Sequence, residues 1–213
     1  MQPDPQVIGL PGWLADGFVE HIEDLTVLAE AHETLEEYFN VLIPPFDLAA
    51  LERSLLGAID AGMVEIGEWK GDVFSPLQFA SELELDHVIR TSTRQTVWLK
   101  LTSEGGNFWA DVRRARWADY LSSYFTLAPD LEAGVGHWEA ASQSKERLVL
   151  LAENIGYLGY QKLGELEWST KFPWEATYWK TLPFAYTVRG QCCEFAMSQP
   201  WPHRIVEAFQ WHD

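Results

Sequence analysis

Apolar residues recur at helical spacing in the first sixty positions and predict two helices there. Residues 20–39 place an apolar side chain every three or four positions and acidic side chains on the other face. Pro44 and Pro45 end this pattern. Asp47 suits the N-cap of a second helix, which Gly62 would end and whose core face would contain Leu48, Leu51, Leu55 and Ile59.

The middle of the chain predicts a helix, a strand and a further helix. Ser75 and Pro76 suit the start of a helix that would bury Leu77, Phe79 and Leu83 and extend to Val88. Residues 96–101 alternate, so Val97, Leu99 and Leu101 would share one face of a strand. Residues 102–106 begin a helix with a broad aromatic stripe, which we expect in the core rather than in a ligand site: Phe108, Trp109, Val112, Trp117, Tyr120, Leu121 and Tyr124.

The last third of the chain predicts one helix followed by strands. Residues 129–136 have the composition of a linker, and residues 145–166 carry leucine and isoleucine at helical spacing. Two strands, 184–188 and 192–197, would be joined by a turn containing Gly190. We therefore predict an α+β protein of two lobes. Residues 1–128 would form an acidic helix and the middle segment, and residues 137–213 a helix with a small, tryptophan-rich antiparallel sheet.

Two short motifs in the middle segment occur in an informative order. The sequence LLGAIDAGMV at 55–64 ends one helix, and LKLTSEGG at 99–106 joins a strand to the next helix. In order and separation they resemble the winged helix-turn-helix regions of bacterial regulators such as the MarR and PadR families. The resemblance covers about residues 46–125 and implies a winged-helix-like lobe.

The sequence departs from these families where DNA contact is expected. A recognition helix reads the major groove with Arg, Lys, Asn or Gln. The corresponding segment, residues 76–87, offers Gln78 together with Glu82, Glu84 and Asp86. Acidic side chains repel phosphates, so we do not expect nucleic acid to be a partner.

The net charge of −17 is distributed unevenly. No Lys or Arg precedes Arg53, so we predict that the acidic residues of the first helix form a partner-binding face: Glu20, Glu23, Asp24, Glu30, Glu33, Glu36 and Glu37. The basic residues cluster later, at Arg113, Arg114 and Arg116. This cluster could bind an anion such as a nucleic acid phosphate, contact a protein partner, pair with the acidic N-terminal helix, or simply be solvated.

The sequence contains no recognisable catalytic or metal-binding motif. No two histidines have the spacing of a metal site, and nucleotide-binding glycine loops and nucleophile elbows are missing. The adjacent Cys192 and Cys193 favour a strand with one thiol on each face over a soft-metal or redox pair. We therefore predict no catalytic residue, cofactor or metal, and a cytoplasmic protein with neither a secretion signal nor a membrane span.

These features favour a non-catalytic bacterial protein that binds another protein. An acidic inhibitor or immunity protein that neutralises a basic toxin or nuclease is the hypothesis that best fits the charge. The alternative is a winged-helix transcription regulator with a C-terminal effector-binding lobe. A third hypothesis is an enzyme with an unrecognised acidic site, because a catalytic carboxylate pair has no sequence signature.

Overall fold

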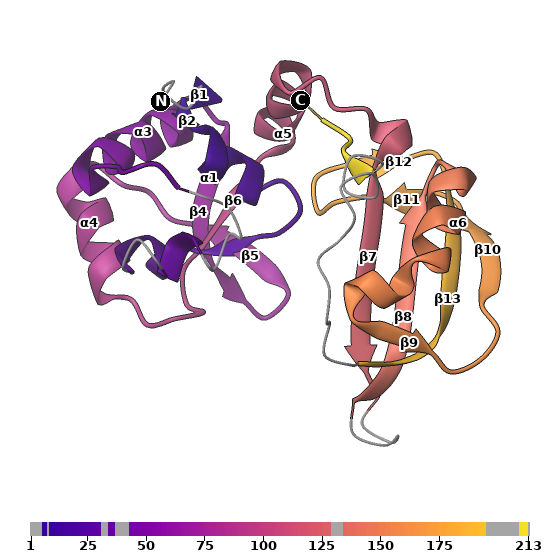
Figure 1. Ribbon diagram of the computed structural model, residues 1–213. Helices are drawn as coiled ribbons and strands as arrows, with labels where there is room; N and C mark the ends of the chain where they lie inside the picture. The colour runs from indigo at the N-terminus through magenta and orange to yellow at the C-terminus, as the bar shows by residue number, and fades with distance from the viewer. Residues whose placement is uncertain are drawn as a thin grey trace. The chain divides into compact units, whose positions relative to one another are not determined.

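The computed structural model describes residues 6–7, 9–30, 34–36, 43–128, 134–194 and 209–212, which form a mixed α+β fold with antiparallel sheets (Figure 1). Contacts within the chain divide it into two units. Unit 1 contains Met1–Val112 and Thr177–Lys180, and unit 2 contains Arg113–Ala176 and Thr181–Asp213. The chain therefore leaves unit 1 after Val112 and returns to it for four residues.

Unit 1 is built on a four-stranded antiparallel sheet with the order β3-β6-β4-β5. A two-stranded hairpin, β1 with β2, precedes it. Its elements are β1 Gln6–Val7, β2 Leu10–Pro11, α1 Gly12–Gly17, β3 Glu23–Asp24, the 3-10 helix η1 Leu25–Ala29, α3 Leu48–Asp60, β4 Val64–Lys70, β5 Val73–Pro76, α4 Glu82–Thr91, β6 Trp98–Leu101 and α5 Ser103–Val112.

The predicted second helix is confirmed as α3. The Asp47 carboxylate accepts a hydrogen bond of 3.2 Å from the backbone N–H of Ala49, which caps the first turn. Leu51 and Leu55 are buried on the core face. The chain turns away at Gly62, where a φ of +72° favours a residue without a side chain.

The two motifs that carry the winged-helix resemblance meet in unit 1. β4 and β6 pair antiparallel with Val64 opposite Leu101. The Thr102 hydroxyl donates a hydrogen bond of 2.6 Å to the carbonyl oxygen of Gly62 and accepts one of 3.0 Å from the N–H of Gly105. A Cβ at Gly105 would lie 2.0 Å from the Met63 carbonyl oxygen, so only glycine fits there. The predicted strand face of Val97, Leu99 and Leu101 is buried, as expected.

The helix predicted over residues 20–39 is wrong in its described first half. Glu23–Asp24 is extended and pairs with β6, with Glu23 opposite Leu99. The Asp24 side chain then caps η1 by accepting a hydrogen bond from the N–H of Thr26. Strand pairing and this cap outweigh the helical periodicity. Residues 31–33 and 37–39 lie outside the described residues.

The next predicted helix begins later than expected. Ser75 and Pro76 end the edge strand β5 instead of starting a helix. Helix α4 begins at Glu82, with Ser81 as its N-cap. The core face of α4 contains Leu85 and Ile89, while Leu83, predicted to be buried, is 77% exposed.

The aromatic stripe divides between a helix, a turn and a strand. Helix α5 ends at Val112, so Trp117 and Tyr124 do not extend its face. Trp109 is fully buried as predicted, and its indole N–H donates a hydrogen bond of 2.7 Å to the Asp16 carboxylate. The same prediction is wrong for Phe108, which is 46% exposed.

The returning segment Thr177–Lys180 packs into unit 1 through two aromatic side chains. The Tyr178 hydroxyl donates to the carbonyl oxygen of Phe18 and accepts from the N–H of Leu101, each at 2.7 Å. The Trp179 indole donates to the carbonyl oxygen of Val19 at 2.9 Å. A Cβ at Gly106 would lie 2.3 Å from the Trp179 ring, so this glycine makes room for the indole.

Unit 2 is built on an antiparallel sheet with the order β10-β13-β8-β7, to which β9 adds by pairing with β13. Helix α6 contacts β8 and β13 (Figure 1). Its elements are the 3-10 helix η2 Trp117–Asp119, β7 Leu121–Leu127, β8 Val135–Ser142, α6 Lys145–Glu153, the 3-10 helix η3 Ile155–Leu158, β9 Tyr160–Lys162, β10 Glu167–Lys171, β11 Trp174–Glu175, β12 Thr181–Leu182 and β13 Ala185–Glu194.

Two apolar clusters form the core of unit 2. One lies between the sheet and α6, with its buried residues at Trp138, Ala140, Leu148, Leu151, Ala152, Ile155, Val188 and Cys192. The other gathers aromatic rings around Tyr120, which stacks on Trp174 with 5.8 Å between ring centroids. Trp117 is only partly buried here, against Tyr120 and Trp211.

The predicted linker does not separate the two units. Residues 129–136 lie between β7 and β8, which pair with each other, for example through Leu127 and Gly136. The division of the chain instead follows Val112, at the end of α5. The composition of residues 129–136 suggested a linker because turn-forming residues are common both in linkers and in segments between strands.

The C-terminal elements also differ from the prediction. The helix expected over 145–166 ends at Glu153 and is followed by η3 and β9. The expected hairpin turn at Gly190 is wrong, because β13 runs through it and pairs Gly190 with Trp138. A Cβ at Gly190 would lie 2.6 Å from the Leu166 side chain, so the glycine accommodates a neighbour rather than a turn. Cys192 is buried and Cys193 partly exposed, as predicted for neighbours on one strand.

Candidate protein-binding surface

Negative charge is concentrated in unit 1. This unit contains 20 of the 32 Asp and Glu residues but only 6 of the 15 Lys and Arg residues. Its formal net charge is therefore −14, against −3 for unit 2. A field of this size attracts basic surfaces and repels phosphates over distances of about a Debye length, roughly 8 Å at physiological salt.

The acidic residues predicted to bind a partner do not share one helical face. Glu20 is exposed, whereas Glu23 is only 8% exposed. Asp24 accepts hydrogen bonds from Thr26 and from the N–H of Gln95, and Glu30 forms an ion pair with Arg94. Several of these carboxylates are therefore already bound to other residues of the same chain.

Two of the remaining predicted residues, Glu33 and Glu37, lie outside the described residues. Glu36 accepts a hydrogen bond of 2.9 Å from the N–H of Ile43. The partner-binding role of this set stays a prediction, but the long helix expected to carry these residues is replaced by the strand Glu23–Asp24 and the 3-10 helix Leu25–Ala29.

A groove of about 700 Å³ runs beside α4. Its lining comes from α4 and from the segment between β5 and α4: Leu77, Gln78, Phe79, Leu83, Glu84, Asp86, His87, Val88, Arg90 and Thr91. Leu83 is the most exposed large apolar side chain in the described residues. Leu77, Phe79 and Val88 line the same groove, so the exposed leucine is part of an apolar cluster rather than an isolated side chain.

The N-terminal cap of α4 shapes one end of the groove. The Ser81 hydroxyl accepts a hydrogen bond from the N–H of Glu84, and the Glu84 carboxylate accepts one of 2.8 Å from the N–H of Ala80. These bonds fix the turn between Phe79 and α4. Leu85 and Ile89 are buried beneath the helix, which leaves Leu83 and His87 on its exposed side.

The margin of the groove is acidic with two compensating arginines. Asp86 pairs with Arg90 one turn later, and Glu82 pairs with Arg53 of α3 at 3.5 Å. Both ion pairs are partly exposed, so they contribute little to stability and remain accessible to a partner.

A carboxyl pair joins α3 to α4 below this margin. Glu52 of α3 is 5% exposed, and no donor in the described parts of the chain reaches its Oε1 atom. Burial, followed by a hydrogen bond and charge repulsion from Asp86, raises the pKa of Glu52. The hydrogen bond from Arg90 lowers the pKa of Asp86. The fold therefore favours the protonated form of Glu52 and the ionised form of Asp86.

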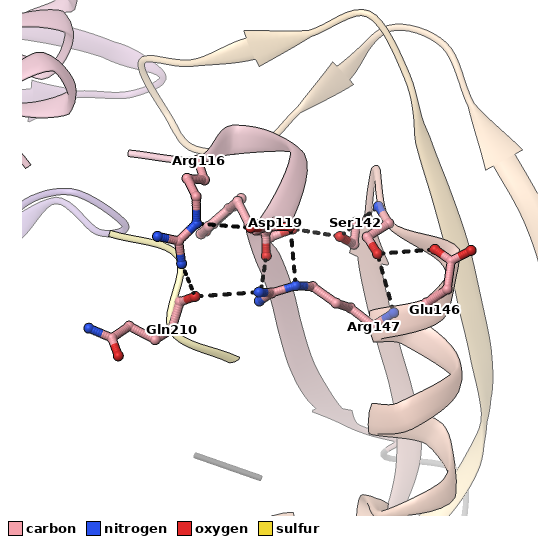
Figure 2. A network of polar contacts seen from close by, with 8 residues as sticks. Arg116, Asp119, Ser142, Glu146, Arg147 and Gln210 are labelled. Carbon is pink, nitrogen blue, oxygen red and sulfur yellow. Dashed lines mark hydrogen bonds and ion pairs between the residues drawn. The ribbon is translucent and has the colours of Figure 1, made fainter. Parts of the chain in front are cut away.

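One arginine of the predicted cluster, Arg116, belongs to a polar network of unit 2 (Figure 2). Arg116 contacts the Asp119 carboxylate at 2.9 Å and donates to the carbonyl oxygen of Gln210 at 2.7 Å. Arg147 contacts the same carboxylate at 3.4 Å and donates to the same Gln210 oxygen at 3.4 Å. The two guanidinium groups thus hold the segment around Gln210 to the body of unit 2.

Neighbouring hydroxyl groups extend this network into α6. The buried Ser142 hydroxyl donates to the carbonyl oxygen of Tyr120 at 2.7 Å and accepts from the N–H of Ser144. The Ser144 hydroxyl caps α6 by accepting from the N–H of Arg147 and also contacts Glu146 (Figure 2). The network therefore binds groups of the chain itself, and the anion-binding role of Arg113, Arg114 and Arg116 stays a prediction.

The sequence did not predict the role of Arg147 in the polar network of unit 2 or the exposure of Leu83 in the groove beside α4. Arg147 lies in an ordinary helix pattern, and no signal connects it to Asp119 or Gln210. The exposure of Leu83 was detectable, because the spacing of Leu85 and Ile89 defines a competing helical face.

The described residues contain no cluster of three or more His, Cys, Asp or Glu able to hold a metal ion. Within the same ranges, no helix has the length and apolar character needed to cross a membrane. Comparisons with family models, curated proteins and solved structures found no match.

Proposed function

We propose that this protein is a non-catalytic module that binds a basic protein, as an immunity-type inhibitor of a toxin or nuclease does. The observation that supports this proposal is the net charge of −14 carried by unit 1. Complementary charge accelerates association with a basic partner and disfavours acidic competitors. The phosphate-binding surface of a nuclease is one basic surface to which such a unit is complementary.

Capture from an extract of the source cells, followed by a quantitative binding measurement, tests the proposal. The wild-type protein is compared with a unit 1 variant in which three exposed carboxylates are neutralised, Asp60→Asn, Asp72→Asn and Asp111→Asn. The matched control neutralises three exposed carboxylates of unit 2, Glu153→Gln, Glu165→Gln and Glu175→Gln.

We expect a basic partner whose association slows in the unit 1 variant and with added salt, and is nearly unchanged in the control. An acidic partner, or equal effects of the two triple variants, would contradict the proposal.

A second candidate is a winged-helix-like transcription regulator. It is supported by the contact between the two motifs, in which Thr102 bonds to Gly62 while β4 pairs with β6. The predicted recognition segment argues against it, since α4 presents Glu82, Glu84 and Asp86 with Arg90 as its one basic residue. A gel-shift titration with genomic fragments at about 0.15 M salt decides between the two. A discrete complex at nanomolar protein would favour the regulator.

A further inference from the structure

The groove beside α4 combines an apolar floor with a charged margin. Leu77, Phe79 and Val88 are half-buried along it, and Leu83 projects from α4 with 77% of its surface exposed. The helix cap at Ser81 and Glu84 holds the two sides of the groove together before any partner arrives. A preformed apolar groove loses little conformational entropy on binding.

The length of the groove matches two turns of a helix. Its lining residues on α4 run from Leu83 to Thr91, which corresponds to about 12 Å at 1.5 Å per residue. Apolar residues at positions i, i+3 or i+4, and i+7 of a partner helix span roughly 10.5 Å. Three anchors at this spacing are the usual way in which an amphipathic helix occupies a groove.

The charge at the margin selects the flanking residues of such a helix. Glu84 and Asp86 line the groove and Glu82 lies beside it on α4. Arg53 and Arg90 offset two of these carboxylates locally, but the unit as a whole carries a net charge of −14. Lys and Arg beside the apolar anchors complement these carboxylates, whereas Asp and Glu there are repelled.

We propose that the groove beside α4 binds an amphipathic basic helix of the partner protein, with Leu83 contacting its central apolar anchor. This inference rests on the proposed function and adds the site, the secondary structure of the ligand and its residue pattern.

Selection from a displayed library of random 16-residue peptides tests the inference on the full-length protein. Peptides are selected on the wild-type protein and counter-selected on a Leu83→Asn variant. Leu163→Asn is the matched control, since Leu163 is an exposed leucine of unit 2. The best peptide is then labelled, and its affinity is measured by fluorescence anisotropy. Two peptide variants are measured beside it, one with a central proline and one with Lys and Arg replaced by Glu.

We expect enriched peptides with helical apolar spacing and flanking Lys or Arg. Leu83→Asn should weaken binding about tenfold or more, because an apolar anchor loses its contact, while Leu163→Asn leaves it unchanged. The central proline and the Glu replacements should each weaken binding at least as much. Failure to enrich peptides that depend on Leu83, or enriched peptides without helical spacing, overturns the inference.

Binding of the captured partner to two variants of the protein distinguishes failure of this inference from failure of the proposed function. If that partner binds the Leu83→Asn variant normally but loses affinity for the Asp60, Asp72 and Asp111 variant, the groove inference fails and the proposed function stands. Enrichment of acidic peptides overturns both.

Discussion

Trp109 and Asp16, from α5 and α1, are joined by an indole-to-carboxylate hydrogen bond of 2.7 Å in the interior of unit 1. The tryptophan is fully buried, whereas the adjacent Phe108 is 46% exposed. The two neighbouring aromatic residues therefore provide an internal comparison of burial on one helix.

We predict that Trp109→Ala lowers the free energy of unfolding by about 3–5 kcal/mol, because it leaves a cavity and removes the hydrogen bond from the indole to the Asp16 carboxylate. Phe108→Ala should lower it by less than about 1 kcal/mol, as expected for a substitution nearer the surface. Urea denaturation of both variants, followed by far-ultraviolet circular dichroism, measures the difference. Similar losses in the two variants would show that the burial assignment is wrong.

Two glycines of unit 1 should respond in opposite directions to alanine. Gly105→Ala places a methyl group 2.0 Å from the Met63 carbonyl oxygen, and we expect a loss of about 1–3 kcal/mol. Gly57 lies in α3, and a Cβ added there would meet no neighbouring atom within 4 Å. Gly57→Ala should therefore stabilise the protein by about 0.5–1 kcal/mol. Thermal unfolding of the two variants tests the pair. Stabilisation by Gly105→Ala would contradict the close approach of α5 to Met63.

The buried carboxyl of Glu52 should make stability depend on pH. The pKa of Glu52 is raised in the folded protein from its ordinary value of 4.5. Its contribution to the free energy of unfolding is therefore fully present below about pH 4.5 and is lost as the pH rises through the pKa of the folded state. Relative to Glu52→Gln, the wild-type protein should therefore become less stable as the pH increases toward about 8.

Denaturant unfolding at a series of pH values measures this difference. Glu153→Gln, at an exposed position, is the control and should follow the wild-type protein throughout. A wild-type protein that gains stability over Glu52→Gln with rising pH would reverse the predicted sign.

Arg147 should be required to hold the segment around Gln210. The side chain is 17% exposed, against 49% for Arg116, and it contacts Asp119 and Gln210. We predict that Arg147→Leu costs about 1–3 kcal/mol, since it removes charged hydrogen bonds, and increases hydrogen exchange at Trp211. The exposed Lys145→Leu serves as the control. Unchanged exchange at Trp211 in Arg147→Leu would show that Arg116 alone suffices.

Local signals predicted the parts of the fold that local interactions determine. The cap at Asp47, the spacing of Leu51 and Leu55 and the turn at Gly62 specify α3 without help from the rest of the chain. The alternation of Val97, Leu99 and Leu101 likewise identified β6, because its one buried face repeats every second residue.

The errors arise where distant residues decide the structure. Glu23 and Asp24 are extended because β6 pairs with them, although their own periodicity is helical. Gly190 continues β13 because Trp138 lies opposite and Leu166 lies over it. The excess of acidic residues in the first half of the chain was visible in the sequence. The groove was not, because it depends on the packing of Leu85 and Ile89, which turns Leu83 outward.

The return of residues Thr177–Lys180 to unit 1 has a consequence for how the gene can be divided or recombined. A chain ending at Val112 has the four-stranded sheet and all of its helices, but it lacks Tyr178 and Trp179. Such a chain loses the hydrogen-bond partners of Phe18, Val19 and Leu101 and the ring that fills the space at Gly106. No single cut in the chain separates unit 1 from unit 2, so an isolated unit 1 has to be assembled from two segments of the gene.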